Sequence, residues 1–163
     1  MAGGVALVGG DEFRVGCEEM DRVILSAAAV QNPILLVVPT AAASENPARA
    51  AYNGVDYFSR LGATASALMV LDARQANDEQ LLAPADVADV IYYTGGSPSH
   101  LLATLAGSLL LDKTLRALDR GAVVAGSSAG AMVMGSWMRF GDWTEALRIV
   151  PGVATLPHHE GSE

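Results

Sequence analysis

Residues 126–130 read Gly-Ser-Ser-Ala-Gly, and this Gly-x-Ser-x-Gly pattern could place Ser128 as a nucleophile. A β-branched pair precedes the pattern and small residues follow it, which is the strand–turn–helix order of a nucleophile elbow. Gly126 and Gly130 lack the Cβ atoms that would clash where the chain reverses into the helix. The backbone N–H of Ala129 would lie in the first turn of that helix, free to bind an oxyanion. The pattern therefore predicts a serine nucleophile beside half of an oxyanion hole.

Two adjacent histidines near the end of the chain are candidates for the general base that a serine hydroxyl needs at neutral pH. His158 directly follows Pro157, which restricts its position more than that of His159. A solvated terminal loop is the alternative interpretation of the pair. The remaining histidine, His100, follows a glycine turn, where it could line a pocket but is a less natural base. We therefore predict His158 as the general base.

A second oxyanion donor is expected at Gly95-Gly96, because a backbone N–H can approach a substrate only where no side chain intervenes. The alternative is a tight turn that needs glycine for its conformation alone. Residues 9–11 form a similar turn, but no Gly-x-Gly-x-x-Gly pattern is present, so no nucleotide cofactor is expected. Residues 158–160 lack the helical spacing of a zinc site, so no metal is expected either.

Apolar runs and helix-spaced apolar residues alternate along the chain, without an internal repeat or a low-complexity linker. Such repeated units predict a doubly wound, mostly parallel α/β sheet with helices on both faces. Pro47 suits the start of a helix capped by Asn46 or Ser44. The chemistry of such sheets gathers beyond the carboxyl ends of the strands, where the candidate site residues would lie. Strands are expected at 5–8, 34–38, 67–71, 90–93, 122–125 and 153–156, and helices at 18–30, 47–61, 78–82, 101–105 and 109–118.

Composition limits the classes of function. The chain has 163 residues, 51% of them hydrophobic and 6% aromatic, which predicts one domain over 1–163 with a core of Ala, Val and Leu. A formal net charge of −8 repels phosphate backbones, so nucleic acid is not an expected partner. The single cysteine excludes an internal disulfide and fits a reducing compartment. The N-terminus does not resemble a signal peptide, so a cytoplasmic location is expected.

The uncharged residues 121–138 are long enough to suggest a membrane span. Four Gly and three Ser among them, with a turn in the middle, favour a buried strand and helix instead. No membrane partner is therefore expected.

A chain rich in small residues also produces Gly-x-Ser-x-Gly by accident, so the strand before the pattern and the helix after it are what favour catalysis.

Three segments match the sequence motifs of a known family and occur in the same order: Thr-Gly-Gly-Ser-Pro-Ser-His-Leu-Leu at 94–102, Arg-Gly-Ala-Val-Val-Ala-Gly-Ser-Ser-Ala-Gly-Ala at 120–131, and Pro-Gly-Val-Ala-Thr-Leu-Pro-His at 151–158. In them the chain resembles the peptidase E (aspartyl dipeptidase) and cyanophycinase family of serine peptidases. The resemblance implies a class I glutamine amidotransferase-like fold, with serine in place of cysteine. It implies Ser128 as nucleophile and His158 as general base. The oxyanion donors would be the backbone N–H groups of Gly96 and Ala129.

The acidic member of the triad departs from the family pattern. Peptidase E-like members carry it well downstream of the histidine, yet this chain ends five residues after His158 and looks short at its C-terminus. Cyanophycinase-like members carry it between serine and histidine, where this chain offers Asp142 and Glu145, and Glu160 is a third candidate. The choice among them stays open. A shortened sheet would also expose an edge, so we predict a homodimer that covers it.

These observations predict a serine-type hydrolase of dipeptides or short peptides, and the resemblance suggests aspartate-containing ones. The acyl group would pass to Ser128 and then to water. Arg139 or Arg148 could recognise an acidic side chain, and the alternative is that both are ordinary surface charges. The alternative is a weakened or inactive binding or regulatory relative that has lost turnover with its acid. An α/β-hydrolase esterase is disfavoured, because the chain has no His-Gly-Gly oxyanion motif.

Overall fold

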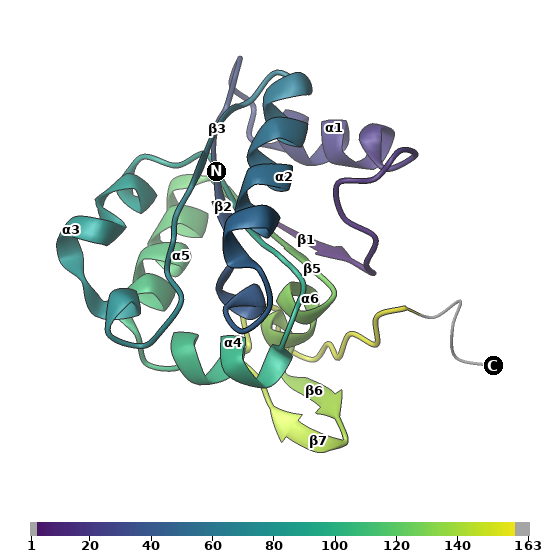
Figure 1. The fold of residues 1–163 in the computed structure, drawn as a ribbon, viewed down its shortest axis with the longest axis vertical. Coiled ribbons are helices and arrows are strands. Elements are labelled where there is room, and N and C mark those ends of the chain that lie inside the picture. The colour runs from purple at the N-terminus through teal and green to yellow at the C-terminus, as the bar shows by residue number, and fades with distance from the viewer. Residues whose placement is uncertain (1–2, 159–163) are drawn as a thin grey trace.

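The computed structural model describes residues 3–158, and a five-stranded sheet forms its centre (Figure 1). The strands are β1 (Gly4–Val8), β2 (Ile34–Val38), β3 (Thr64–Ala67), β4 (Val90–Tyr93) and β5 (Val123–Ser127). Neighbouring strands are parallel, in the order β1-β5-β4-β2-β3. The carboxyl ends of β1, β5 and β4 therefore lie side by side at one end of the sheet.

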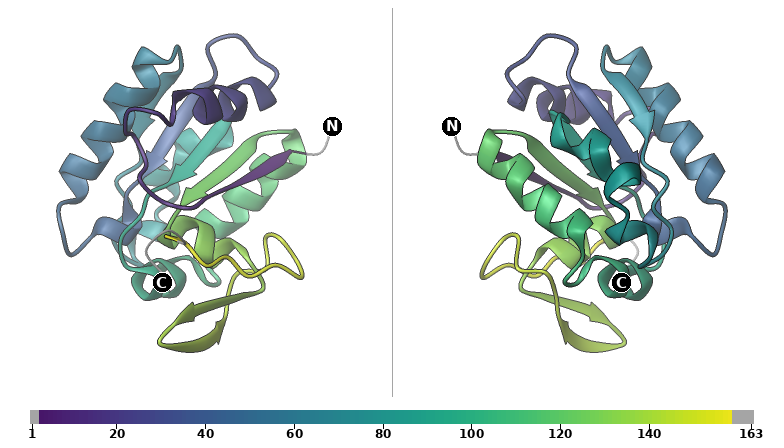
Figure 2. Two further views of the ribbon diagram at one scale, coloured as in Figure 1. Left: turned by 90° about the vertical axis from the view of Figure 1, so that its right-hand side faces the viewer. Right: turned by 90° about the vertical axis from the view of Figure 1, so that its left-hand side faces the viewer.

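Helices cover both faces of the sheet (Figure 2), which confirms the predicted fold class. In β2, Leu35 and Val37 point to one face, and Leu36 and Val38 to the other. Short 3₁₀ turns lie at Thr40–Ala42, Gln75–Asn77 and Ala83–Asp86. The first face packs against α1 (Glu18–Ala27) and α2 (Pro47–Arg60), and the second against α3 (Glu79–Leu82), α4 (Pro98–Leu105), α5 (Leu109–Arg120) and α6 (Ala129–Met134).

Local sequence explains where α2 and α5 begin and end. The side chain of Asn46 accepts a hydrogen bond from the N–H of Arg49 at 3.1 Å, and Pro47 occupies the first turn, as predicted. Ser108 caps α5 in the same way, also at 3.1 Å. Gly121 ends α5 with a φ of 102°, a conformation that glycine adopts without a Cβ clash.

The prediction of the third strand was wrong. Strand β3 covers Thr64–Ala67, whereas the apolar pattern predicted residues 67–71. Leu68 and Val70 are buried, but they enter the core from the loop that follows the strand. Because β3 is an edge strand and partly exposed, it lacks the continuous apolar run of a strand buried on both faces.

The segment after α6 also differs from the prediction. No strand forms at 153–156, where only Ala154 makes an isolated bridge, to Trp137. An antiparallel hairpin of β6 (Trp137–Phe140) and β7 (Asp142–Glu145) follows α6 instead. The hairpin projects from the sheet end in yellow-green in Figure 1. Its strands are short and mostly exposed, so no apolar run marks them in the sequence.

Two further boundaries are decided by the structure. The uncharged residues 121–138 are divided among β5, α6 and the start of β6. Within residues 3–158, no helix has both the length and the apolar character to cross a membrane. Helix α1 ends at Ala27 rather than at residue 30, because Ala29 takes a φ of 56° and leaves the helical conformation.

The loop between β1 and α1 is anchored by Phe13. Asp11 and Phe13 in this loop have φ values of 55° and 63°, which are unfavourable for residues other than glycine. Aromatic packing offsets this cost and presents the intervening Glu12 at the sheet end. The Phe13 ring lies with its centroid 5.7, 5.7 and 5.4 Å from the rings of Tyr57, Phe58 and Tyr92.

Tyr57→Phe is expected to destabilise the fold, because the Tyr57 hydroxyl donates to the buried carboxylate of Asp21 at 2.7 Å. The other carboxylate oxygen has no partner among the described residues. Losing the donor should lower the free energy of unfolding at pH 7 by about 1–3 kcal/mol, as urea denaturation would measure. The matched control is Tyr52→Phe, which removes an exposed hydroxyl and should change the free energy by less than about 0.5 kcal/mol.

The pH dependence of this loss follows from the pKa of Asp21. Burial raises that pKa above its ordinary value of 3.8, and the Tyr57 hydrogen bond opposes the rise. An acid with a raised folded pKa loses stability as the pH rises from its unfolded pKa through its folded pKa. The cost of Tyr57→Phe should therefore be larger at pH 7 than in acidic buffer, and an equal cost at both would contradict this explanation.

Candidate active site

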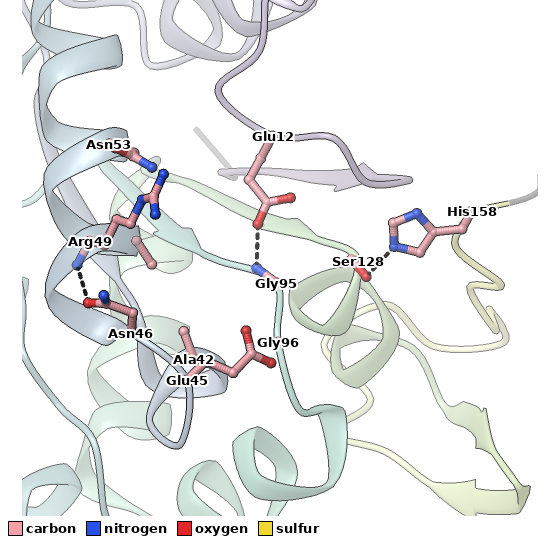
Figure 3. Close-up of a pocket in the computed structure, with 11 residues that line it drawn as sticks. Glu12, Ala42, Glu45, Asn46, Arg49, Asn53, Gly95, Gly96, Ser128 and His158 are labelled. Atoms are coloured by element: carbon pink, nitrogen blue, oxygen red, sulfur yellow. Dashed lines mark hydrogen bonds between the residues drawn. The ribbon is translucent and has the colours of Figure 1, made fainter.

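Ser128 occupies a sharp turn between β5 and α6 (Figure 3). Its φ of 49° and ψ of −108° are unfavourable for a residue with a side chain. A Cβ atom on Gly126 would lie 2.4 Å from the backbone of Gly130, and one on Gly130 would lie 2.4 Å from the carbonyl oxygen of Tyr93. The Ser128 N–H donates to the carbonyl of Val8 at 2.9 Å. Close packing around two glycines thus holds the serine in its strained conformation.

His158 faces the hydroxyl of Ser128, with Nε2 and Oγ 2.9 Å apart. The backbone N–H of His158 donates to the carbonyl of Gly9 at 3.1 Å. A Cβ atom on Gly10, whose φ is 146°, would lie 2.4 Å from Cε1 of the imidazole. The histidine therefore reaches the serine from a segment that lies along the Gly9-Gly10 turn, and the bare Gly10 backbone makes room for its ring.

No carboxylate within residues 3–158 is hydrogen-bonded to the Nδ1 atom of His158. Two of the predicted acids, Asp142 and Glu145, lie in the exposed strand β7, and neither lines the cavity at the serine. The third, Glu160, lies outside the described residues, as does His159. The described part of the chain thus brings a serine and a histidine together without an acid.

Two backbone N–H groups flank Ser128. Ala129 begins α6, and its N–H has no acceptor among the described residues. The same holds within residues 3–158 for the N–H of Gly96, whose φ is 139°. A Cβ atom on Gly96 would lie 2.2 Å from the carbonyl oxygen of Ala41, so only glycine fits there. The preceding N–H, that of Gly95, is already occupied, since it donates to a Glu12 carboxylate oxygen at 2.8 Å.

A cavity of about 430 Å³ opens in front of Ser128 and His158. Polar side chains from α2 and the turn before it line much of this cavity: Glu45, Asn46, Arg49 and Asn53 (Figure 3). The guanidinium of Arg49 makes no ion pair with any group in the described part of the chain. The site therefore combines a serine–histidine pair, free backbone donors and one available cation.

Residues 5–162 match the family model of peptidase family S51. The chain belongs to this family. Membership in S51 confirms the resemblance to the peptidase E family and makes the protein a serine-type peptidase by class. No curated protein matches the sequence.

Two solved structures resemble this S51 member. The crystal structure of a peptidase from an acI-B1 Actinobacterium has a TM-score of 0.89 and 29% identity over 98% of this chain. A putative peptidase E protein from Listeria monocytogenes EGD-e has a TM-score of 0.63 and 19% identity over 84% of this chain, which shows the fold alone. The chain spans 70% of the first structure and 64% of the second.

Some residues considered in the sequence lie away from the S51 site. Arg139 is exposed in β6, and Arg148 lines a different cavity beside Trp137. The His100 ring nitrogen Nε2 lies 2.8 Å from the carbonyl oxygen of Leu71, and this histidine does not line the serine cavity. Neither arginine lines the serine cavity, because the tertiary fold carries both away from it.

The sequence analysis missed Glu12 and Arg49 as site residues. Glu12 lies in the loop after the first strand, beyond its carboxyl end, where chemistry was expected. Arg49 lies in the first turn of α2, which begins near the same end of the sheet. Both residues are charged and lie near the carboxyl ends of the strands, and this combination is the signal by which the sequence could have revealed them.

Proposed function

We propose that this S51 peptidase hydrolyses dipeptides or short peptides through nucleophilic attack by Ser128, with His158 as general base. The observation that carries the proposal is the 2.9 Å contact between Ser128 Oγ and His158 Nε2 at a strained strand-to-helix turn. A base can take the hydroxyl proton within a hydrogen-bond distance of roughly 2.6–3.2 Å.

The proposed reaction has two steps. In the first, Oγ of Ser128 attacks the carbonyl carbon of the peptide bond while its proton moves to Nε2 of His158. The N–H groups of Gly96 and Ala129 stabilise the negative charge on the carbonyl oxygen. The C–N bond then breaks, and His158 returns the proton to the leaving amine. In the second step, water attacks the acyl-enzyme with the same histidine as base, which releases the acid and restores the serine.

In this proposal, backbone contacts hold the imidazole of His158 in its orientation. An acid that bonds Nδ1 normally selects the tautomer and holds the ring. Here the N–H of His158 is held by Gly9, and the ring packs on Gly10. These contacts support a histidine that is placed well enough to act as a base.

A short, acidic substrate fits the groups that line the cleft. Arg49 supplies a free cation to the serine cavity, and we propose that it binds a carboxylate of the substrate, such as an aspartate side chain. A second cavity of about 660 Å³ shares Glu12, Arg49, Asn53 and His158 with the first. The cleft therefore continues beyond the serine, which supports short peptides as well as dipeptides.

Fluorophosphonate labelling tests the proposal. The parent protein should acquire one label, and peptide mapping by mass spectrometry should locate it on Ser128, with hydrolysis of Asp-X dipeptides in parallel. The serine control is Ser59→Ala, which removes an exposed hydroxyl on α2 and should leave labelling unchanged. Folded parent protein that neither labels nor hydrolyses would favour a binding or regulatory relative. The observation that favours this alternative is that no carboxylate in residues 3–158 is hydrogen-bonded to His158.

Arg49→Ala is expected to raise KM for Asp-X dipeptides about 10–100-fold, because a hydrogen bond to a charged group contributes about 1.5–3 kcal/mol. The change in kcat should be small if the arginine binds substrate in the ground state and the transition state alike. Arg49→Lys retains the charge and should lie between parent and Arg49→Ala. Asn-X dipeptides, which lack the side-chain carboxylate but keep the C-terminal one, serve as control substrates, and an equal loss with them would contradict recognition of the aspartate side chain.

A further inference from the structure

Glu12 lies between the two turns that carry Ser128 and Gly96, and we infer that its carboxylate is a positioning residue for both. The inference rests on the proposed function of the serine site and adds to it a residue outside the serine–histidine pair and the oxyanion donors. It is carried by hydrogen bonds, close packing and the anchoring of the Glu12 loop.

Each oxygen of the Glu12 carboxylate accepts one hydrogen bond. Oε1 accepts from the backbone N–H of Gly95 at 2.8 Å (Figure 3), and Oε2 accepts from the hydroxyl of Ser127, also at 2.8 Å. The two donors lie 83 and 115 positions away in the chain. A single side chain thus joins the loop after β1 to the turn after β4 and to the last residue of β5.

The bond to Gly95 bears on the oxyanion donor. The Gly95 N–H belongs to the Thr94–Gly95 peptide, so this bond anchors the peptide next to the one that carries the Gly96 N–H. The space is tight, since a Cβ atom on Gly95 would lie 2.8 Å from Glu12 Oε1 and 3.4 Å from the Cβ of Ser128. On its other side the turn is held by the Ser97 N–H, which donates to Ala41 at 2.8 Å. Glu12 and Ala41 therefore hold the turn from both sides.

The bond to Ser127 bears on the nucleophile. Ser127 is fully buried, and it immediately precedes the strained Ser128. A strained residue keeps its conformation only when the surrounding structure holds it there. The Glu12 carboxylate supplies one such restraint, in addition to the hydrogen bond from the Ser128 N–H to Val8.

The loop that carries Glu12 is itself held in place. The Phe13 ring packs among Tyr57, Phe58 and Tyr92 in the core. On the outer side, Arg14 pairs with Asp11 at 3.0 Å. Glu12 is therefore presented to the two turns from a loop with its own anchor, as a positioning residue requires.

The contacts also distinguish Glu12 from an acid that would complete a triad with His158. Both carboxylate oxygens already accept hydrogen bonds from other groups, and neither is bonded to His158. Glu12 thus acts on the reaction through Gly95 and Ser127 rather than by moving a proton.

The test compares Glu12→Ala, Glu12→Gln and the surface control Glu19→Ala in the full chain. Glu12→Ala should lower kcat for an Asp-X dipeptide about 10–100-fold, with KM changed less than about threefold, because misplaced groups slow the chemical step more than binding. Glu12→Gln keeps an acceptor for Gly95 and a partner for the Ser127 hydroxyl, so it should restore kcat to within about threefold of the parent. Its pH profile should match that of the parent, and Glu19→Ala should behave as the parent.

Hydrogen exchange separates this inference from the proposed function. The Gly95 amide should exchange at least about tenfold faster in Glu12→Ala than in the parent or in Glu12→Gln. If kcat and Gly95 exchange are both unchanged in Glu12→Ala, or if Glu12→Gln is as slow as Glu12→Ala, the inference is overturned. If the parent itself neither hydrolyses nor labels, the proposed function fails. The exchange result alone then supports or overturns the role of Glu12 in holding Gly95.

Discussion

Ser128→Ala and His158→Ala are each expected to lower kcat/KM for an Asp-X dipeptide about 10⁴-fold, and the double variant should be no slower than Ser128→Ala alone. The reason is that the two side chains act as one unit across the 2.9 Å between Oγ and Nε2. Without the serine there is no nucleophile for the histidine to activate, and without the histidine the serine keeps its proton. The backbone donors remain in every variant, so a small residual rate over the uncatalysed reaction is expected.

The measurement is a double-variant cycle on purified protein, with fluorophosphonate labelling rates followed beside hydrolysis. Ser59→Ala accompanies the cycle as the serine control. Losses that multiply, so that the double variant is far slower than either single variant, would show that the two residues act independently and would contradict the proposed pair. Unfolding curves must coincide for all variants, since a loss caused by unfolding would not report on chemistry.

Gly10→Ala is expected to lower kcat about 100-fold, because displacing a catalytic group by about 1 Å has effects of this size. The new Cβ atom would lie 2.4 Å from Cε1 and 2.7 Å from Nδ1 of His158. The ring is the mobile partner in this clash, so it must swing away from Ser128. The φ of 146° at Gly10 is also unfavourable for alanine, which adds strain to the same turn.

Gly9→Ala is the matched control for this prediction. A Cβ atom on Gly9 would meet no atom within 4 Å, and the carbonyl that accepts the His158 N–H remains in the variant. Its activity should therefore stay close to that of the parent, as kinetics with the same dipeptide would measure. Equal losses in both variants would mean that the turn tolerates no side chain for reasons unrelated to the histidine.

These two predictions depend on how His158 is held. In residues 3–158 no carboxylate bonds Nδ1, so the backbone contact to Gly9 and the packing on Gly10 carry the orientation of the ring. A site of this kind should respond to changes in the Gly9-Gly10 turn more strongly than a site in which an acid also holds the histidine.

The amino-acid sequence by itself determined the features that depend on neighbouring residues. The turn at Ser128 follows from glycines two residues away on either side, whose missing Cβ atoms permit the reversal. The buried strands at 34–38 and 90–93 follow from uninterrupted apolar runs, and the start of α2 from Asn46 and Pro47. In each case the physical cause acts over a few residues, so the pattern can be recognised without the fold.

Edge elements were harder to predict, because burial on one face or none leaves little apolar pattern. The position of strand β3 was therefore predicted incorrectly, and the exposed hairpin of β6 and β7 was missed. Leu68 and Val70 pack into the core as a loop, so their apolar character indicated burial but not strand structure.

Only the tertiary structure decided which charged groups surround the serine. Glu12 reaches partners 83 and 115 positions away, and no spacing in the sequence marks such contacts. Arg49, rather than Arg139 or Arg148, lines the cavity because α2 begins beside the carboxyl ends of the strands, whereas the hairpin carries Arg139 outward. Contacts between distant segments depend on how the helices and loops pack on the sheet, and that packing is a property of the whole chain.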